Sequence, residues 1–170
     1  MKKIMKTLMA VAAVALFASC GGGNGQSDVT SGLPQKQYEG DHVSFTYPEI
    51  MGEANKLSFG EENVEVTSAD SKYKISLTYQ SSNACKPADL ETFYNNFKGM
   101  SMYKDWTFDA PVINGNVMTF KATKGDQVEN HIAYGTEEGP GLNGTFSYPT
   151  ADAETYDKAT IELANSIKLK

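Results

Sequence analysis

Stretches in which apolar and polar residues alternate recur along the chain, and this period of two is the spacing of a half-buried β-strand. The first three stretches lie at residues 43–47, 63–67 and 73–79. Asp70 and Ser71 stand between the second and third stretches, where a tight turn is expected. The pattern therefore predicts three strands, of which the last two form an antiparallel hairpin.

The spacing of apolar residues changes once in the middle of the chain, from the period of a strand to that of a helix. Four apolar side chains then follow the i, i+3, i+4, i+7 spacing of one helix face, namely Leu90, Phe93, Tyr94 and Phe97. Pro87 precedes this segment and Gly99 follows it, as is typical of the two ends of a helix. We predict a helix over residues 89–98 whose aromatic face packs on the sheet.

Strand patterns return after this helix, at residues 107–113, 117–123, 128–134 and 142–148. The Asn114-Gly115 pair between the first two is a strong hairpin signal. A second amphipathic segment over residues 152–166 predicts a closing helix. The order of elements indicates an α+β fold, with an antiparallel sheet of about six to seven strands and two main helices packed on it.

The first nineteen residues have the layout of an export signal. Lys2, Lys3 and Lys6 stand before an uncharged apolar run over residues 8–18. A transmembrane helix needs about 20 apolar residues, so this run is too short for a permanent span. We expect residues 1–19 to direct export and then to be removed.

The end of the export signal and the residue after it resemble the lipobox of bacterial lipoproteins, with the sequence Leu16-Phe17-Ala18-Ser19-Cys20. Phe17 stands where that family most often has leucine. The resemblance implies cleavage between Ser19 and Cys20 and attachment of lipid, palmitate included, to Cys20. An ordinary secretory signal that ends in a cysteine is the alternative. Lipidation would anchor the exported protein to the cell membrane or outer membrane, with its domain facing the periplasm or the cell surface.

A flexible tether is expected over residues 20–37, because residues 21–28 are rich in glycine and have no apolar side chain to pack. The remaining residues, 38–170, are numerous enough for one domain with its own core. The expected organisation is a signal peptide at 1–19, a lipidated tether at 20–37 and a single α+β domain at 38–170.

The charge of the chain argues against one class of partner. Without the three lysines of residues 1–19, twelve lysines remain against 21 acidic residues, a formal charge of −9. All basic residues are lysines, so the guanidinium fork that suits phosphate groups is missing. We therefore expect no nucleic-acid partner.

The sequence contains few groups that could carry out catalysis. No familiar nucleophile, metal-ligand or phosphate-binding motif is present. Cys85 is interpreted as a partly buried small residue, with a nucleophile or an intermolecular disulfide as the alternatives. His131 alternates in step with Glu129 and is expected to face solvent. We predict no catalytic residue, no metal site and no cofactor.

The order of strands and helices, together with Phe45-Thr46-Tyr47-Pro48 near the start and Ala164-Asn165-Ser166-Ile167-Lys168-Leu169 at the end, is similar to the PsbP-like family. The similarity covers about residues 38–170. It implies an α/β/α sandwich with a central antiparallel sheet. It also implies binding of other proteins rather than catalysis, as in the PsbP subunit of photosystem II and the Ran-binding relatives. No functional residue is carried over from the family.

These observations favour a membrane-anchored lipoprotein that acts as a non-catalytic binding module for a protein or small-molecule partner in the cell envelope. Such a module needs an exposed apolar or aromatic patch. Trp106, with Tyr103 nearby, is the candidate contact, and burial of Trp106 at the sheet edge is the alternative.

Two other functions stay open at this point. An envelope hydrolase would require carboxylates such as Asp105 and Asp109 to converge with His42 or His131 in a pocket. A cell-surface glycan-binding protein would require a row of exposed tyrosines.

Overall fold

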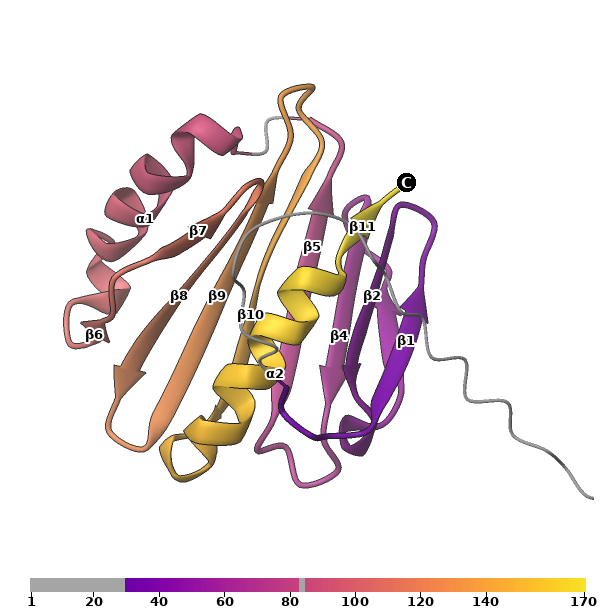
Figure 1. Ribbon diagram of the computed structural model, residues 1–170, viewed down its shortest axis with the longest axis vertical. Coiled ribbons are helices and arrows are strands. Elements are labelled where there is room, and N and C mark those ends of the chain that lie inside the picture. The colour runs from indigo at the N-terminus through magenta and orange to yellow at the C-terminus, as the bar shows by residue number, and fades with distance from the viewer. Residues whose placement is uncertain (1–29, 83–84) are drawn as a thin grey trace, which may run out of the picture.

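The computed structural model describes residues 30–82 and 85–170 (Figure 1). The expected signal peptide and Cys20 lie outside these residues. The strands are β1 (Gln35–Glu39), β2 (Val43–Pro48), β3 (Ala54–Leu57), β4 (Glu62–Thr67), β5 (Lys74–Gln80), β6 (Thr107–Phe108), β7 (Val112–Asn114), β8 (Val117–Lys124), β9 (Gln127–Gly135), β10 (Gly141–Pro149) and β11 (Lys168–Leu169). The two α-helices are α1 (Leu90–Lys98) and α2 (Ala153–Ser166).

Eight strands form the main sheet, in the order β3-β4-β5-β10-β9-β8-β6, with β7 also paired to β8. All of these pairings are antiparallel. Strand β10 lies between β5 and β9, so it joins the early hairpin to the later strands; Ile75 of β5 lies opposite Phe146 of β10. The expected α+β fold with a mostly antiparallel sheet and two main helices is confirmed.

A second, three-stranded sheet has the order β1-β2-β11 and lies beside α2 (Figure 1). The strand at residues 43–47 was expected in the same sheet as the others, and instead β2 is the centre of this small sheet. Both of its neighbours come from segments with no strong strand pattern, so alternation alone could not assign its partners. Strand β1 begins at Gln35, and the backbone N–H of Ser31 donates to Glu162 of α2 at 3.0 Å. Residues 31–37 therefore belong to the domain and not to the expected tether.

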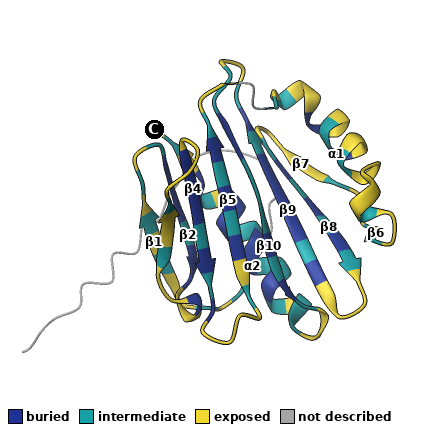
Figure 2. Ribbon diagram, turned by 180° about the vertical axis from the view of Figure 1, so that it is seen from behind, coloured by how far each residue is buried: buried dark blue, intermediate teal, exposed yellow. Residues whose placement is uncertain are grey.

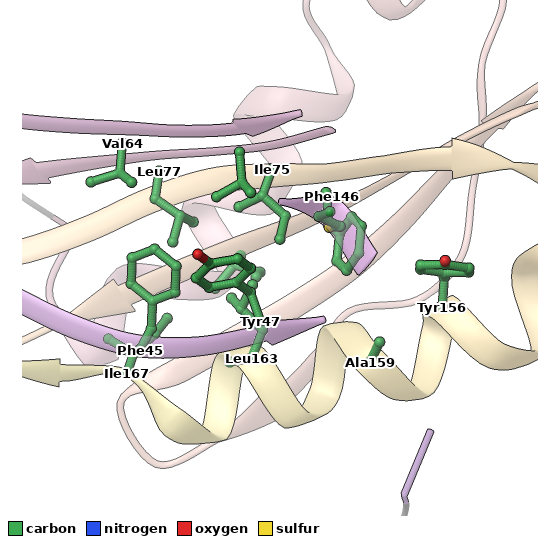
Figure 3. Packing of buried hydrophobic residues seen from close by; sticks show 14 of the residues in the cluster. Phe45, Tyr47, Val64, Ile75, Leu77, Phe146, Tyr156, Ala159, Leu163 and Ile167 are labelled. Carbon is green, nitrogen blue, oxygen red and sulfur yellow. The ribbon is translucent and has the colours of Figure 1, made fainter. Parts of the chain in front are cut away.

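The main core lies between one face of the large sheet, helix α2 and the small sheet. Phe45 and Tyr47 of β2 and Leu163 of α2 point toward Phe146 and its neighbours on the sheet (Figure 3). Each of these four side chains is at most 1% exposed. Full burial of such a side chain contributes about 1.5–3 kcal/mol, so α2 and the small sheet are held on this face by apolar packing.

A smaller core holds α1 against the opposite face of the sheet. Its buried members are Leu90 and Tyr94 of α1 and Met118, Phe120 and Ala133 of the sheet. A nine-residue helix is too short to be stable by itself in water, so this contact is what keeps α1 formed. The predicted stripe at 90, 93, 94 and 97 does pack on the sheet.

Two local differences from the expected strands have simple causes. The strand expected at 107–113 is divided into β6 and β7 around Pro111, which has no backbone N–H to donate to a ladder. The hairpin between β7 and β8 is confirmed, but Asn114 pairs with Val117, so its two turn residues are Gly115 and Asn116. Gly115 has φ of +58°, the left-handed conformation that glycine adopts readily at the first position of such a turn. No helix within residues 30–82 and 85–170 is long and apolar enough to cross a membrane.

Candidate functional site

One face of the main sheet is only partly covered. Helix α1 lies over the β8 and β9 side, and no helix of residues 30–82 and 85–170 stands in front of β4, β5 and β10 on this face (Figure 2). Because side chains alternate across a strand, the positions opposite the main core are polar there. The half-buried members of this polar row are Ser76 and Thr78 on β5 and Asn143, Thr145 and Ser147 on β10.

Three neighbouring cavities lie on this face, two beside α1 and the third over β5, β9 and β10, and together we call them the open-face groove. Their volumes are about 260, 130 and 590 Å³. The central, 130 Å³ cavity shares Phe93 and Asn143 with the first and Thr145 with the third, so the three adjoin one another. The central cavity is lined by Phe93, Phe97, Tyr103, His131, Ile132, Asn143, Gly144 and Thr145.

The polar centre of the groove is formed by Glu129 and His131, two residues of β9 whose side chains lie on the same face of the sheet. The Nε2 atom of His131 lies 3.4 Å from Oε2 of Glu129. The hydroxyl of Tyr103 donates to the same carboxylate oxygen at 3.1 Å. Among the described residues, His131 Nε2 is the one buried side-chain polar atom without a hydrogen bond of good geometry, and the Glu129 carboxylate is the acceptor beside it. Such atoms are rare because leaving them unsatisfied is costly.

His131 is only 4% exposed, so the expectation that it faces solvent was wrong. Its ring stacks on Phe120, with centroids 4.7 Å apart, and contacts Phe97 at 4.4 Å. Tyr103 meets the ring edge-on at 5.7 Å. The period of β9 correctly places His131 and Glu129 on one face; that face is then covered by α1, which the local pattern could not indicate.

The environment of Glu129 keeps it ionised. Its pKa lies below the ordinary value of 4.5 because the His131 imidazole beside it favours the carboxylate, and the Tyr103 hydroxyl adds to this. Burial, together with the nearby Glu129 charge, raises the pKa of Tyr103 well above its ordinary value of 10.0. At neutral pH the site therefore presents a neutral hydroxyl donor and a charged acceptor.

The lysines at the open end of the groove already have acidic partners. Lys74 pairs with Glu65 at 2.7 Å, and Lys72 pairs with Asp70 at 3.4 Å. Neither the first nor the central cavity is lined by a lysine, and Asp89 in the first is the one charged residue that lines either of them. The part of the groove next to α1 is thus acidic.

Cys85 lines the first cavity as a half-buried free thiol. Burial raises its pKa above the ordinary value of 9.0, which lowers the thiolate fraction at neutral pH. Its carbonyl oxygen packs directly on Gly135 of β9, where a Cβ would have no room. A thiol in this state is suited to packing and not to nucleophilic attack.

Of the two residues predicted to contact a partner, Tyr103 lies in the groove and Trp106 lies next to it. Trp106 is half-buried and meets the Tyr103 ring edge-on, with centroids 5.6 Å apart. Nearby Met102 is 70% exposed. The predicted cleavage and lipid-attachment residues, Ser19 and Cys20, lie outside the described residues.

The two carboxylates named for a hydrolase, Asp105 and Asp109, pair with lysines and not with a histidine. Asp105 pairs with Lys124 at 3.8 Å, and Asp109 pairs with Lys121 at 3.3 Å. His42 stacks on Tyr79, with centroids 4.8 Å apart. Within the described part of the chain, no three His, Cys, Asp or Glu side chains are placed to hold a metal ion.

Sequence reasoning missed Glu129 as a site residue, and it named His131 only for the alternative hydrolase site. One sequence signal for the groove was available: the apolar face of α1 has more aromatic side chains than its packing on the sheet requires. Leu90 and Tyr94 are enough to bury the helix, whereas Phe93 and Phe97 are only half-buried and line the groove. Surplus aromatic side chains on a short helix indicate a second contact beyond its own core.

A polar network lies on the other side of the sheet, beneath α2. The carboxylate of Asp157 accepts hydrogen bonds from Tyr148 Oη and from Asn130 Nδ2, and it pairs with Lys121 at 3.1 Å. These groups satisfy one another, and the network ties α2 to β8, β9 and β10. An apolar cavity of about 230 Å³ lies nearby between α2 and β7–β8.

Comparisons with known proteins identify the fold. No protein-family model and no curated protein matches the sequence. The solution structure of cyanobacterial PsbP (CyanoP) from Synechocystis sp. PCC 6803 is similar with a TM-score of 0.56 at 11% identity, covering 91% of this chain and 99% of that chain. A crystal structure from Bacteroides thetaiotaomicron VPI-5482 has a TM-score of 0.48 at 14% identity, covering 75% of this chain and 45% of the other. The likeness to CyanoP confirms the expected PsbP-like fold.

Proposed function

We propose that this chain, which has a PsbP-like fold, is a membrane-anchored lipoprotein whose domain is a non-catalytic binding module for a protein or small-molecule partner in the cell envelope. The open-face groove carries this proposal. It combines an apolar wall from α1 with a polar floor from β5 and β10, which is the usual make-up of a ligand site.

The groove chemistry favours binding over catalysis. A general acid or base works best with a pKa near the operating pH. The pKa of Glu129 lies below its ordinary value, and the pKa of Tyr103 lies above its own. Both shifts move these groups away from neutral pH. The Cys85 thiol is shifted in the same unreactive direction.

The entry of the chain into the domain supports the same function. The lipobox at residues 16–20 is the sequence basis for the anchor. Ser31 contacts Glu162 of α2, so the chain enters the domain on the α2 side of the main sheet. The groove lies on the opposite face of the main sheet, which α1 partly covers. An anchor at the N-terminal segment would therefore leave the groove free to meet a partner.

The anchor is tested by labelling cells with radioactive palmitate. We expect the label in the wild-type protein and its loss in Cys20→Ala, which should also leave the membrane fraction. Cys85→Ala is the matched control, because it removes the other cysteine and should keep both label and membrane attachment. An unlabelled wild type, or a membrane-bound Cys20→Ala protein, would rule out the lipoprotein assignment.

The binding groove is tested by photo-crosslinking in intact cells. A photoreactive amino acid replaces Ser76, which lines the groove, or Glu154, which is exposed on α2. We expect a defined crosslinked species from position 76 and none from position 154. Equal crosslinking at both positions would contradict the groove as the binding surface, and hydrolytic turnover by the purified domain would contradict a non-catalytic role.

A further inference from the structure

We propose that strand β7 binds an extended peptide of another protein as an added strand. Two side chains of this peptide would face α2: an apolar one and, two positions later, a basic one. They would enter the two cavities that lie between α2 and β7–β8. These cavities lie on the opposite face of the main sheet from the open-face groove, so this is a second site, beyond the proposed function.

The outer edge of β7 can offer main-chain hydrogen bonds. In the described part of the chain β7 pairs with β8 alone, and Val112 and Ile113 are 66% and 45% exposed (Figure 1). Asn114 lies opposite Val117 across a two-residue turn, so the main chain of Val112 and Asn114 is directed toward β8. The N–H and C=O of Ile113 then point outward. An added strand would exchange two hydrogen bonds with Ile113, which fixes its register.

An apolar cavity lies beside this edge. It measures about 230 Å³, and its apolar lining comes from Val112, Val117, Ile161 and Ala164. An engineered apolar cavity of about 150 Å³ binds benzene, so this one has room for a leucine-sized side chain. Asn114 also lines the cavity. Since directly opposite residues of an antiparallel pair share a face, the peptide residue opposite Asn114 would point to the face on which this cavity lies.

The adjoining cavity has an excess of negative charge. It measures about 150 Å³ and is lined by Asp109, Lys121 and Asp157. The ammonium group of Lys121 lies 3.3 Å from the Asp109 carboxylate and 3.1 Å from the Asp157 carboxylate. Two carboxylates thus share the one cation that lines this cavity. The Asp109 side chain is 58% exposed, so it is accessible to a basic side chain of the peptide.

The order of the two cavities along the chain determines the peptide pattern. Asn114 lines the apolar cavity, Ala110 lines the charged one, and Val112 lines both. A strand antiparallel to β7 passes them in reverse order. Its apolar residue therefore comes first and its basic residue two positions later, about 6.8 Å further along the strand.

A second copy of this chain has the wrong charge for the same place. Paired with itself about Ile113, β7 would bring Val112 to the apolar cavity and Asn114 to the carboxylates. An uncharged asparagine supplies no cation to the carboxylates. Charge complementarity therefore favours a different protein with a basic residue at this position.

The test is a titration of the purified protein with the peptide acetyl-Thr-Leu-Thr-Lys-Thr-amide, followed by NMR. We expect a dissociation constant of roughly 1 mM or tighter, with signal changes centred on Val112, Ile113 and Thr119. At a peptide concentration about five times the dissociation constant, hydrogen exchange of the Ile113 amide should slow about sixfold, because its hydrogen bond is made only in the complex. Absence of these changes would overturn the proposal.

Three changes to the peptide separate the three contacts. Alanine in place of leucine should weaken binding at least about tenfold, because roughly three methylene-sized groups are no longer buried. Methylation of the central amide nitrogen removes the donor to the Ile113 carbonyl and should also weaken binding at least about tenfold. Norleucine in place of lysine should weaken it about threefold. A modified peptide that binds as well as the parent would overturn the proposal.

A cavity-filling substitution tests the location of the site. Thr119 lines both cavities, so Thr119→Phe should weaken peptide binding at least about tenfold. Thr145→Phe is the matched control, because Thr145 is a half-buried threonine of the same sheet that lines the open-face groove. Its affinity should stay within about twofold of wild type. Thermal melts check that both variants fold, and unchanged binding to Thr119→Phe would overturn the proposal.

A charge substitution tests the basic residue of the peptide. Asp109→Asn should abolish the preference for the lysine peptide over the norleucine peptide. Asp105→Asn is the matched control, since Asp105 is equally exposed and pairs with Lys124, outside both cavities; the preference should remain. A preference for lysine that survives Asp109→Asn would contradict the proposed contact.

The outcome is independent of the open-face groove. If no peptide binds while crosslinking at position 76 persists, strand addition at β7 fails and the proposed function stands. If the peptide binds and position 76 gives no specific crosslink, the groove fails and the β7 site stands. A concentration-dependent dimer that Thr119→Phe abolishes would identify a second copy as the occupant and overturn the proposal.

Discussion

Leu90 anchors α1 to the sheet, and we expect Leu90→Ala to release this helix while the main core stays folded. Leu90 is fully buried in the small core, which contains five buried side chains against eighteen in the main core. A nine-residue helix does not persist without such a contact. The two cores lie on opposite faces of the sheet, so the small one can open separately.

The size of the effect follows from the deleted atoms. Leu→Ala removes roughly three methylene-sized groups at about 0.8 kcal/mol each, and a cavity cost brings the total to about 3 kcal/mol. Because about 1.4 kcal/mol is a factor of ten, the protection of α1 amides from hydrogen exchange should fall by about 100-fold. Phe93 and Phe97 leave the groove when α1 detaches, so ligand binding should weaken too.

Leu163→Ala is the matched substitution in the main core, because Leu163 is also fully buried. It should lower the free energy of global unfolding by a similar amount, and with it the protection of amides in β5 and β10. The α1 amides, which exchange through local opening, should be little affected. If Leu163→Ala lowered α1 protection as much as β10 protection, α1 would unfold only with the whole domain and the argument from two separate cores would be refuted.

Three further changes test the polar contacts. Tyr148→Phe removes a hydroxyl that donates to Asp157 and should cost about 2 kcal/mol of unfolding free energy in urea; a loss below about 0.5 kcal/mol would contradict this. Because the pKa of Glu129 is lowered in the folded protein, its stabilising contribution is present above pH 4.5 and is lost as pH falls through the folded pKa. Glu129→Gln should therefore flatten the acid decline in stability, and parallel decline curves would count against it. The hydrogen bond to Asp152 raises the pKa of Tyr73 to about 12, so its contribution is present below pH 10 and is lost as pH rises through 12. Tyr73→Phe should remove one late-titrating phenol from the ultraviolet titration, and an unchanged curve would disprove the assignment.

Much of the secondary structure could be predicted from the sequence because its causes are local. The alternation at residues 73–79 and the apolar spacing from Leu90 to Phe97 follow directly from the periods of a strand and a helix. The hairpin that the Asn114-Gly115 pair signalled depends on the conformation of two turn residues, Gly115 and Asn116. The boundary of the domain was predicted less well, since β1 gains its order from pairing with β2 and not from its own composition.

The candidate site could not be predicted in the same way. Tyr103 was singled out for its residue type, whereas its partner Glu129 is 26 positions away and comes within 3.1 Å only in the folded chain. His131 was assigned to solvent because a strand pattern shows which residues share a face and not what covers that face. Its burial depends on where α1 packs.

The sequence by itself determined the class of fold and the two helices, because each of these depends on residues close together in the chain. The export and lipidation signal rests on the sequence alone and stays a prediction. Only the tertiary structure decided that β10 enters between β5 and β9, that β2 leaves the main sheet and that α1 closes one side of the open face. Those arrangements depend on contacts between distant segments. They bring Glu129, His131 and the aromatic face of α1 into one groove, which is the binding surface proposed for this protein.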